Sequence, residues 1–117
     1  MICRVWHGWT SVGDAQRYDD YLQKELFPRL DVELRAHGYR GYQLLRRNQG
    51  QEIEFVTMLW FDSIESVRSF AGENHEVPVL SEKARSLLTR FADRADHYQL
   101  GGSNLSGWSM QDNSRTN

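Results

Sequence analysis

The stretch that most constrains the fold is EIEFVTMLWFD, residues 52–62. Alternate side chains of a β-strand point to opposite faces, and a strand with one wet face alternates apolar with polar residues. Here both sets are largely apolar, so we expect a strand that is covered on both faces. The first set is Ile53, Phe55, Thr57, Leu59 and Phe61, and the second is Glu54, Val56, Met58 and Trp60.

Before this stretch the sequence predicts one strand and one long helix. Residues 2–9 are rich in β-branched and aromatic types, which favour a strand. Between Asp14 and Gly38 a leucine or tyrosine recurs at every fourth position, which is typical of an amphipathic helix. Pro28 removes a backbone donor, so we expect a kink or break next to it. Gly38 is expected to end the helix.

A hairpin and a second helix are predicted next. Residues 39–47 are expected to form the second strand, and the turn residues 48–51 fold it back onto 52–62. Asp62 and Glu65 have the spacing of a capping box. We therefore expect the second helix to start directly after the hairpin.

The remaining chain predicts a further helix, a last strand and a tail. Gly72 is expected to end the second helix, and an irregular link follows. Ser81 can cap a further helix that reaches Phe91, and the last strand is expected at 93–100. Residues 101–117 are rich in Gly, Ser and Asn, so we expect a flexible C-terminal tail after a single domain at 1–100.

The order of these elements is β-α-β-β-α-β. This order predicts an α+β, ferredoxin-like fold, with a four-stranded antiparallel sheet and both helices on one face. Such a fold leaves the second face of 52–62 bare, and a large exposed apolar face favours aggregation. We therefore expect a homodimer in which two sheets pack together as a dimeric α+β barrel.

Composition and charge argue against several classes of protein. The formal net charge is −2 and charges of both signs are interspersed, so neither nucleic acid nor a membrane surface is an expected partner. Cys3 is the single cysteine, which excludes an internal disulfide and a cysteine-rich zinc site and fits a reducing compartment. Nowhere are there about 18 consecutive apolar residues. We expect a soluble cytoplasmic protein.

Four stretches resemble the antibiotic biosynthesis monooxygenase family of dimeric α+β barrels. They are RVWHGWT (4–10), GYRGYQLLRR (38–47), EFVTMLWFDSIESVRSFAG (54–72) and TRFADRADHYQL (89–100), and the resemblance runs over residues 2–100. It implies the fold and the dimer. It also implies a superfamily whose members include cofactor-independent monooxygenases of aromatic polyketides and heme-degrading monooxygenases. Others perform isomerase, decarboxylase or dismutase-type reactions.

Heme degradation is disfavoured within this resemblance. Phe70 stands where the heme-degrading members have a tryptophan, Leu80 falls near their histidine position, and His7 replaces their first-strand asparagine. We therefore expect no heme and no other cofactor. His75, in the nearby loop, is the one residue that keeps the heme alternative open.

His7 is the first candidate for catalysis. It lies in the apolar stretch VWHGW, where an ionisable ring is costly unless it is hydrogen-bonded. As a general base it could remove a phenolic proton and so produce an anion able to donate an electron to dioxygen. The alternative is a buried histidine that a backbone carbonyl or a cross-strand partner satisfies.

His75 and His97 are further candidates. His75 lies in an irregular segment from which loops reach a cleft, and could act as a base or as a donor to the substrate; the alternative is a solvated loop histidine. His97 falls in the last strand, which neighbours the first, so we expect it near His7. The three histidines lack a short ligand spacing, and no metal site is expected.

Aromatic residues form the expected surroundings of the site. They most often build a core or a dimer interface, but they can also line a flat pocket for a polycyclic substrate. The residues concerned are Trp6, Trp9, Tyr42, Trp60 and Tyr98.

Arg4 completes the candidate site and alternates with Trp6 on the first strand. It could neutralise a developing phenolate or peroxide oxygen, although pairing with an acidic side chain is the more common arrangement. Together these residues predict a cofactor-independent monooxygenase of a small aromatic or quinol-type substrate, bound between sheet and helices. The alternative is a non-catalytic small-ligand binding or stress-response protein on the same dimeric scaffold.

Overall fold

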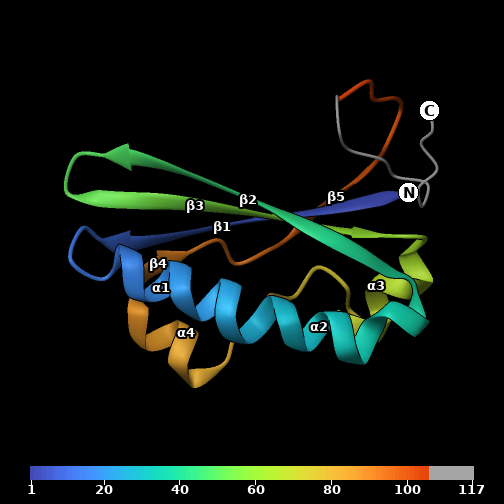
Figure 1. Cartoon of the computed structure of the whole chain (residues 1–117), viewed down its shortest axis with the longest axis horizontal. Coiled ribbons are helices and arrows are strands. Elements are labelled where there is room, and N and C mark those ends of the chain that lie inside the picture. Colours follow the sequence, from blue (N-terminus) through green and yellow to red (C-terminus); the bar gives the residue numbers. More distant parts are fainter. Residues whose placement is uncertain (106–117) are drawn as a thin grey trace.

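The computed structural model describes residues 1–105, and within them the fold is one antiparallel sheet with helices on one face (Figure 1). The strand order is β2-β3-β1-β4, and β5 also pairs with β1. The strands are β1 (Ile2–Ser11), β2 (Tyr39–Gln49), β3 (Glu52–Phe61), β4 (Leu88–Phe91) and β5 (Asp96–Gln99). The α-helices are α1 (Ala15–Tyr21), α2 (Phe27–Leu34), α3 (Ile64–Ala71) and α4 (Glu82–Leu87).

The predicted α+β, ferredoxin-like architecture is confirmed, with one correction at its last strand. That strand is split in two, so the described sheet has five strands rather than four. β4 pairs with the second half of β1 through Gly8 and Phe91, and β5 pairs with the first half through Arg4 and His97. Both pieces occupy the same edge of β1.

The predicted helix from Ser81 to Phe91 is therefore wrong beyond Leu87. Its cap is as expected, since the Ala84 N–H donates to Ser81 Oγ at 3.1 Å. The next four residues leave the helix because pairing with β1 satisfies their backbone groups.

The irregularity predicted next to Pro28 takes the form of a π-helical segment, Leu22–Leu26, between α1 and α2. The Phe27 N–H donates to the Leu22 carbonyl, one residue further back than in an α-helix. Because proline has no N–H and its ring crowds the preceding turn, a wider turn lets the chain continue as a helix.

Gly38 ends the long helical segment, as predicted. After a 3-10 turn at Arg35–His37, it adopts φ 99°, which favours glycine. A Cβ at this position would lie 2.0 Å from Ser66 Oγ, so the close approach of α3 also requires glycine.

The helix predicted after the hairpin is α3, and it begins one residue later than the capping-box pattern indicates. Ser63 is the cap, because its Oγ accepts from the Ser66 N–H at 3.2 Å. Asp62 instead forms an ion pair with Arg40, with 2.6 Å between Oδ2 and Nη2. The helix ends at Gly72 as expected, at φ 88°.

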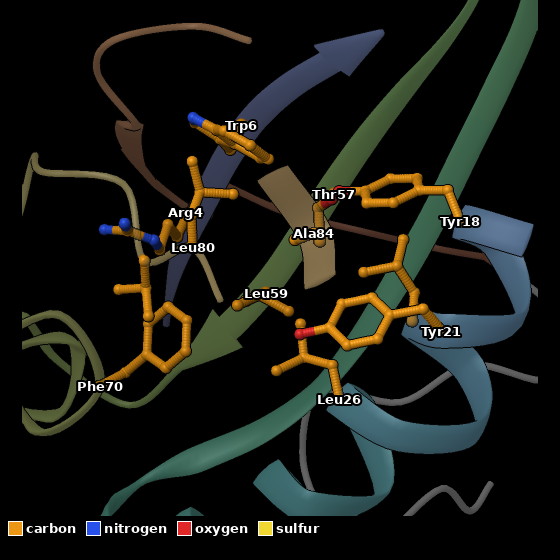
Figure 2. Close-up of a pocket in the computed structure, with 12 residues that line it drawn as sticks. Arg4, Trp6, Tyr18, Tyr21, Leu26, Thr57, Leu59, Phe70, Leu80 and Ala84 are labelled. Carbon is orange, nitrogen blue, oxygen red and sulfur yellow. The ribbon is translucent and has the colours of Figure 1, made fainter. Parts of the chain in front are cut away.

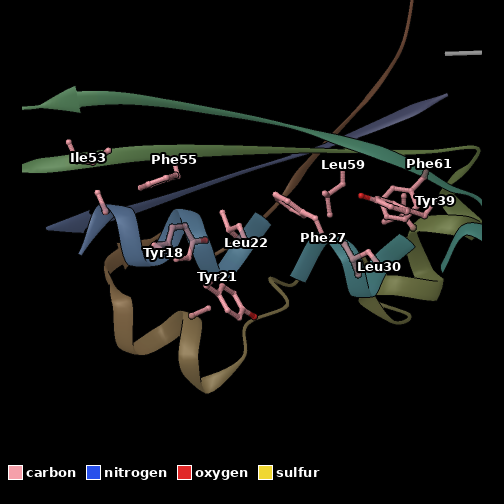
Figure 3. Close-up of a cluster of buried hydrophobic side chains, with 13 residues drawn as sticks. Tyr18, Tyr21, Leu22, Phe27, Leu30, Tyr39, Ile53, Phe55, Leu59 and Phe61 are labelled. Carbon is pink, nitrogen blue, oxygen red and sulfur yellow. The ribbon is translucent and has the colours of Figure 1, made fainter. Parts of the chain in front are cut away.

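The hydrophobic core lies between the sheet and the helices (Figure 3). Phe55, Leu59 and Phe61 of β3 point into it, and the Tyr18 ring meets Phe55 edge-on at 5.0 Å between centroids. The helices thus cover the first of the two apolar sets of β3.

The second set of β3 lies on the opposite face, which we call the open face. Glu54, Val56, Met58 and Trp60 share it with the β1 residues that pair with them in register. Val56 and Met58 are only half-buried there. The helices do not cover this face.

Two expectations concern features beyond the sheet. Among residues 1–105, no helix has the length and apolar character needed to span a membrane. Most of the expected C-terminal tail, including Trp108, falls within residues 106–117, which lie outside the described residues.

Candidate functional site

A hollow between the sheet and the helices is the candidate functional site (Figure 2). Together with its mouth it encloses about 490 Å³ of empty space, but a water molecule can enter only about 40 Å³ of it. Its lining is apolar and aromatic with few polar groups. The lining residues are Arg4, Trp6, Tyr18, Tyr21, Leu22, Leu26, Thr57, Leu59, Phe70, Val79, Leu80 and Ala84.

The alternation of β1 brings two of these residues into the hollow. Arg4 pairs with Leu59 and Trp6 pairs with Thr57, so both belong to the set that faces the helices. Arg4 and Phe70 lie on one side of the hollow and Tyr21 lies on the other (Figure 2). The site is therefore assembled from the sheet, from α1, the π-helical segment, α3 and α4, and from the link before α4.

Arg4 is buried, with 3% of its surface exposed. Its Nη1 donates to the His75 carbonyl and Nη2 donates to the Val77 carbonyl at 2.9 Å. Its guanidinium carbon lies 5.3 Å from the centre of the Phe70 ring. No carboxylate among residues 1–105 forms an ion pair with it, so the expected acidic partner is wrong.

His97 lies directly beside Arg4, with 3.1 Å between Nε2 and Arg4 Nη1. Since a guanidinium can only donate, Nε2 accepts, and the ring proton belongs on Nδ1. Burial, together with Arg4 and His75, lowers the pKa of His97 to about 4. His97 is therefore neutral near pH 7. Burial lowers the pKa of Arg4 to about 10, so Arg4 stays charged.

The structure brings His75 and His97 together and leaves His7 apart. The His75 and His97 rings meet edge-on at 4.8 Å between centroids, next to Arg4. His7 lies on the open face, so its expected proximity to His97 is wrong. Whether any of these histidines acts as a base stays a prediction.

His7 has a cross-strand partner, which was the alternative to a catalytic role. Its Nδ1 lies 2.8 Å from Glu54 Oε2, and Arg47 Nε donates to the other Glu54 oxygen at 2.5 Å. The hydrogen bond from His7, with help from Arg47, holds the pKa of the Glu54 carboxyl below its usual range. His7 and Glu54 thus form a satisfied pair away from the hollow.

Of the five aromatic candidates, Trp6 lines the hollow, and the other four do not. Trp9 and Trp60 lie on the open face, where they donate to Gln49 and Gln43 respectively. Tyr98 pairs with Cys3 on that face and is 58% exposed.

Tyr42 faces the helices but packs away from the hollow. Its ring stacks on Phe27 at 3.8 Å between centroids, and its hydroxyl donates to Gln23. A role for Tyr42 in ligand binding therefore gains no support from its contacts.

Sequence reasoning missed Tyr21 and Phe70 as lining residues. Tyr21 lies three positions after Tyr18 on the buried side of α1, and its hydroxyl lies 2.8 Å from Ser81 Oγ. That spacing signals a shared helix face, but it does not distinguish a cavity wall from a filled core. No cluster of three His, Cys, Asp or Glu side chains able to hold a metal occurs in the described part of the chain.

Comparison with known proteins identifies the fold. No family model matches the chain, and no curated protein matches it. The chain is similar in structure to a candidate antibiotic biosynthesis monooxygenase from Bacillus cereus, with a TM-score of 0.60 and 11% identity over 91% of this chain and 96% of that one.

A second solved structure is a dimeric ferredoxin-like protein from an uncultured marine organism. The TM-score is 0.55 and the identity is 14%, over 89% of this chain and 96% of that one. At such identities the likeness extends to the ferredoxin-like fold and not to an activity.

Proposed function

We propose that the protein is a cofactor-independent monooxygenase of a small aromatic or quinol-type substrate, which binds in the hollow. One observation carries the proposal: an aromatic hollow ends at a buried arginine that has no carboxylate partner among residues 1–105. Aromatic walls suit a flat ring, and a buried cation stabilises negative charge that develops on a ring oxygen. The structural similarity to the candidate monooxygenase from Bacillus cereus supports a monooxygenase function.

The chemistry needs an electron-rich anion and dioxygen. A phenolate transfers an electron to dioxygen, and the two radicals then combine at a ring carbon. The resulting peroxide anion takes a proton from water. Its outer oxygen then leaves as water with that proton and the hydrogen of the ring carbon, and the inner oxygen stays in the product as a carbonyl. The substrate supplies all the electrons. Arg4 stabilises the phenolate and the peroxide, while His97 and the His75 carbonyl hold the guanidinium in place.

Substrate entry requires a movement of the chain. The space open to water is too small for an aromatic ring, and Val79 and Leu80 form part of the wall. Both belong to the irregular link between α3 and α4. This link is the segment we expect to shift, because loops give way more readily than a sheet.

The same proposal includes a homodimer. The open face carries the half-buried Val56 and Met58, and Leu45 beside them is 53% exposed. A second copy of this sheet would cover these side chains and complete the barrel. The marine neighbour is named as dimeric, which supports this arrangement.

A non-catalytic ligand-binding protein is the second candidate. The observation that favours it is the lining of the hollow, which includes no histidine and no carboxylate from residues 1–105. A site without an obvious proton acceptor binds a ligand as readily as it converts one.

Oxygen uptake separates the two candidates. Purified protein is incubated with a panel of naphthols, anthrones and hydroquinones, with air or under nitrogen, before and after treatment with a chelator. We expect uptake with at least one compound, one oxygen molecule consumed per quinone formed without release of hydrogen peroxide, and no effect of the chelator. Tight binding without uptake across the panel would contradict the monooxygenase and favour the second candidate.

A further inference from the structure

We propose that the ligand of the hollow is an aromatic oxyanion, ionised before it binds, and that its charge pairs with Arg4. This inference rests on the proposed function, since it assigns a charge to the ligand of the same hollow. It rests on the contacts of the Arg4 side chain.

Arg4 is the only buried cationic side chain among residues 1–105. The arginines at the surface commonly have carboxylate partners, such as Asp62 for Arg40 and Glu76 for Arg94. Within the described part of the chain, Arg4 has only neutral acceptors, namely two backbone carbonyls and His97. A buried charge without a counter-charge is costly, so an anion that enters the hollow recovers interaction energy that the free protein lacks.

The guanidinium retains donors for such an anion. Of its five N–H groups, two on Nη1 serve the His75 carbonyl and His97, and one on Nη2 serves the Val77 carbonyl. The Nε–H and the second Nη2–H have no acceptor among the described residues. These two N–H groups are the donors that an oxyanion beside Arg4 would use.

The lack of a base among the described lining residues also favours a ligand that is ionised before it binds. The described residues that line the hollow include no histidine and no carboxylate. His97 uses its lone pair on Arg4, and His7 lies on the open face. His75 lies beside His97 but is not one of the lining residues. A neutral phenol would need a proton acceptor at this site, whereas a ligand that arrives ionised needs none.

The same contacts also allow a purely structural role for Arg4. The carbonyls of His75 and Val77 belong to the link before α4, so Arg4 ties this link to β1. A structural tie alone predicts no preference for the charge of the ligand, whereas an anion site does.

Matched ligands test the charge directly. Binding of 2-naphthoate and 2-naphthamide to the full chain is measured by isothermal titration calorimetry, since the two molecules share their ring and shape and differ in charge. We expect 2-naphthoate to bind the wild-type protein roughly tenfold or more tightly than 2-naphthamide. Arg4→Met should remove this preference, and Arg29→Met, at an exposed arginine of α2, should keep it.

The possible results separate this inference from the proposed function. Equal affinities for the wild-type protein would overturn the charge assignment alone, whether or not Arg4→Met folds. A preference for 2-naphthoate that persists in a folded Arg4→Met protein would overturn the role of Arg4. A preference that depends on Arg4, in a protein that consumes no oxygen, would support the anion site and contradict the monooxygenase. Failure of both ligands to bind would overturn the anion site, while the oxygen-uptake panel decides the monooxygenase separately.

Discussion

His7 Nδ1 lies 2.8 Å from Glu54 Oε2 between the neighbouring strands β1 and β3, on the face turned away from the helices. The Glu54 carboxylate is buried and has a second partner in Arg47. This hydrogen-bonded pair explains why the ionisable His7 ring lies inside an apolar strand. The explanation does not require His7 to act in catalysis.

Replacement of His7 by alanine therefore tests a structural role. His7→Ala leaves Glu54 short of one hydrogen bond, so the free energy of unfolding should fall by about 1–3 kcal/mol, as measured by urea denaturation. Oxygen uptake should stay at the wild-type level, because His7 does not line the hollow. The exposed His37→Ala is the matched control. A loss of turnover by about 10²–10⁴ in a folded dimer would instead identify His7 as the base.

The open face should be the dimer interface. Sedimentation velocity is expected to find a dimer at micromolar concentration, with an interface of roughly 2,000 Å² or more in total. Val56→Glu places a charge on this face and should yield monomeric or insoluble protein. Val32→Glu is the control, because Val32 on α2 is 86% exposed. A stable wild-type monomer at these concentrations would rule out the dimer.

The hydroxyl of Tyr39 offers a test of the core. It is buried, and it has no hydrogen-bond partner among residues 1–105. Tyr39→Phe removes this unsatisfied group, so the free energy of unfolding should stay the same or rise by up to about 1 kcal/mol. Tyr21→Phe, which loses the contact with Ser81 Oγ, should lower it by about 0.5–1.5 kcal/mol. A marked loss of stability in Tyr39→Phe would indicate that water satisfies this hydroxyl.

His97 should make stability depend on pH. Its folded pKa of about 4 lies below the value near 6.5 expected in the unfolded chain. Between these values the unfolded chain binds more protons, so the free energy of unfolding falls as the pH falls from about 6.5 to 4. Arg4 and His75 add to this lowering of the pKa, while Glu76 and Asp96 oppose it.

A variant isolates this contribution. His97→Gln keeps an acceptor for Arg4 and removes the titrating group, so the decline between pH 6.5 and 4 should be shallower than in the wild-type protein. His37→Gln should retain the wild-type decline. An identical decline in His97→Gln would mean that other groups cause it.

Local patterns were sufficient to predict most of the fold. The first apolar set of 52–62 predicted a strand packed against helices, and Gly38 and Gly72 marked the ends of helices. The cover expected over the second set stays a prediction. Residues 88–91 could not be predicted in the same way. Leu88 and Phe91 fit a helical period, and these residues form a strand because of their pairing with the distant Gly8 and its neighbours.

The site was harder to predict because both alternating sets of the first strand are rich in apolar residues. Arg4 and Trp6 belong to one set, and His7 and Trp9 belong to the other. No local pattern decides which set faces the helices. The register with β3 decides it, and it places Arg4 in the hollow and His7 on the open face.

Filling the hollow tests whether the ligand binds there. Ala84 is 3% exposed and lines the hollow, whereas Ala36 lies exposed after α2. Affinity for the best compound of the oxygen-uptake panel is measured by calorimetry on the wild-type protein, Ala84→Phe and Ala36→Phe. We expect Ala84→Phe to remain folded, since overpacking costs about 1–3 kcal/mol, and to lose binding, while Ala36→Phe keeps it. Unchanged affinity in a folded Ala84→Phe protein would contradict the account.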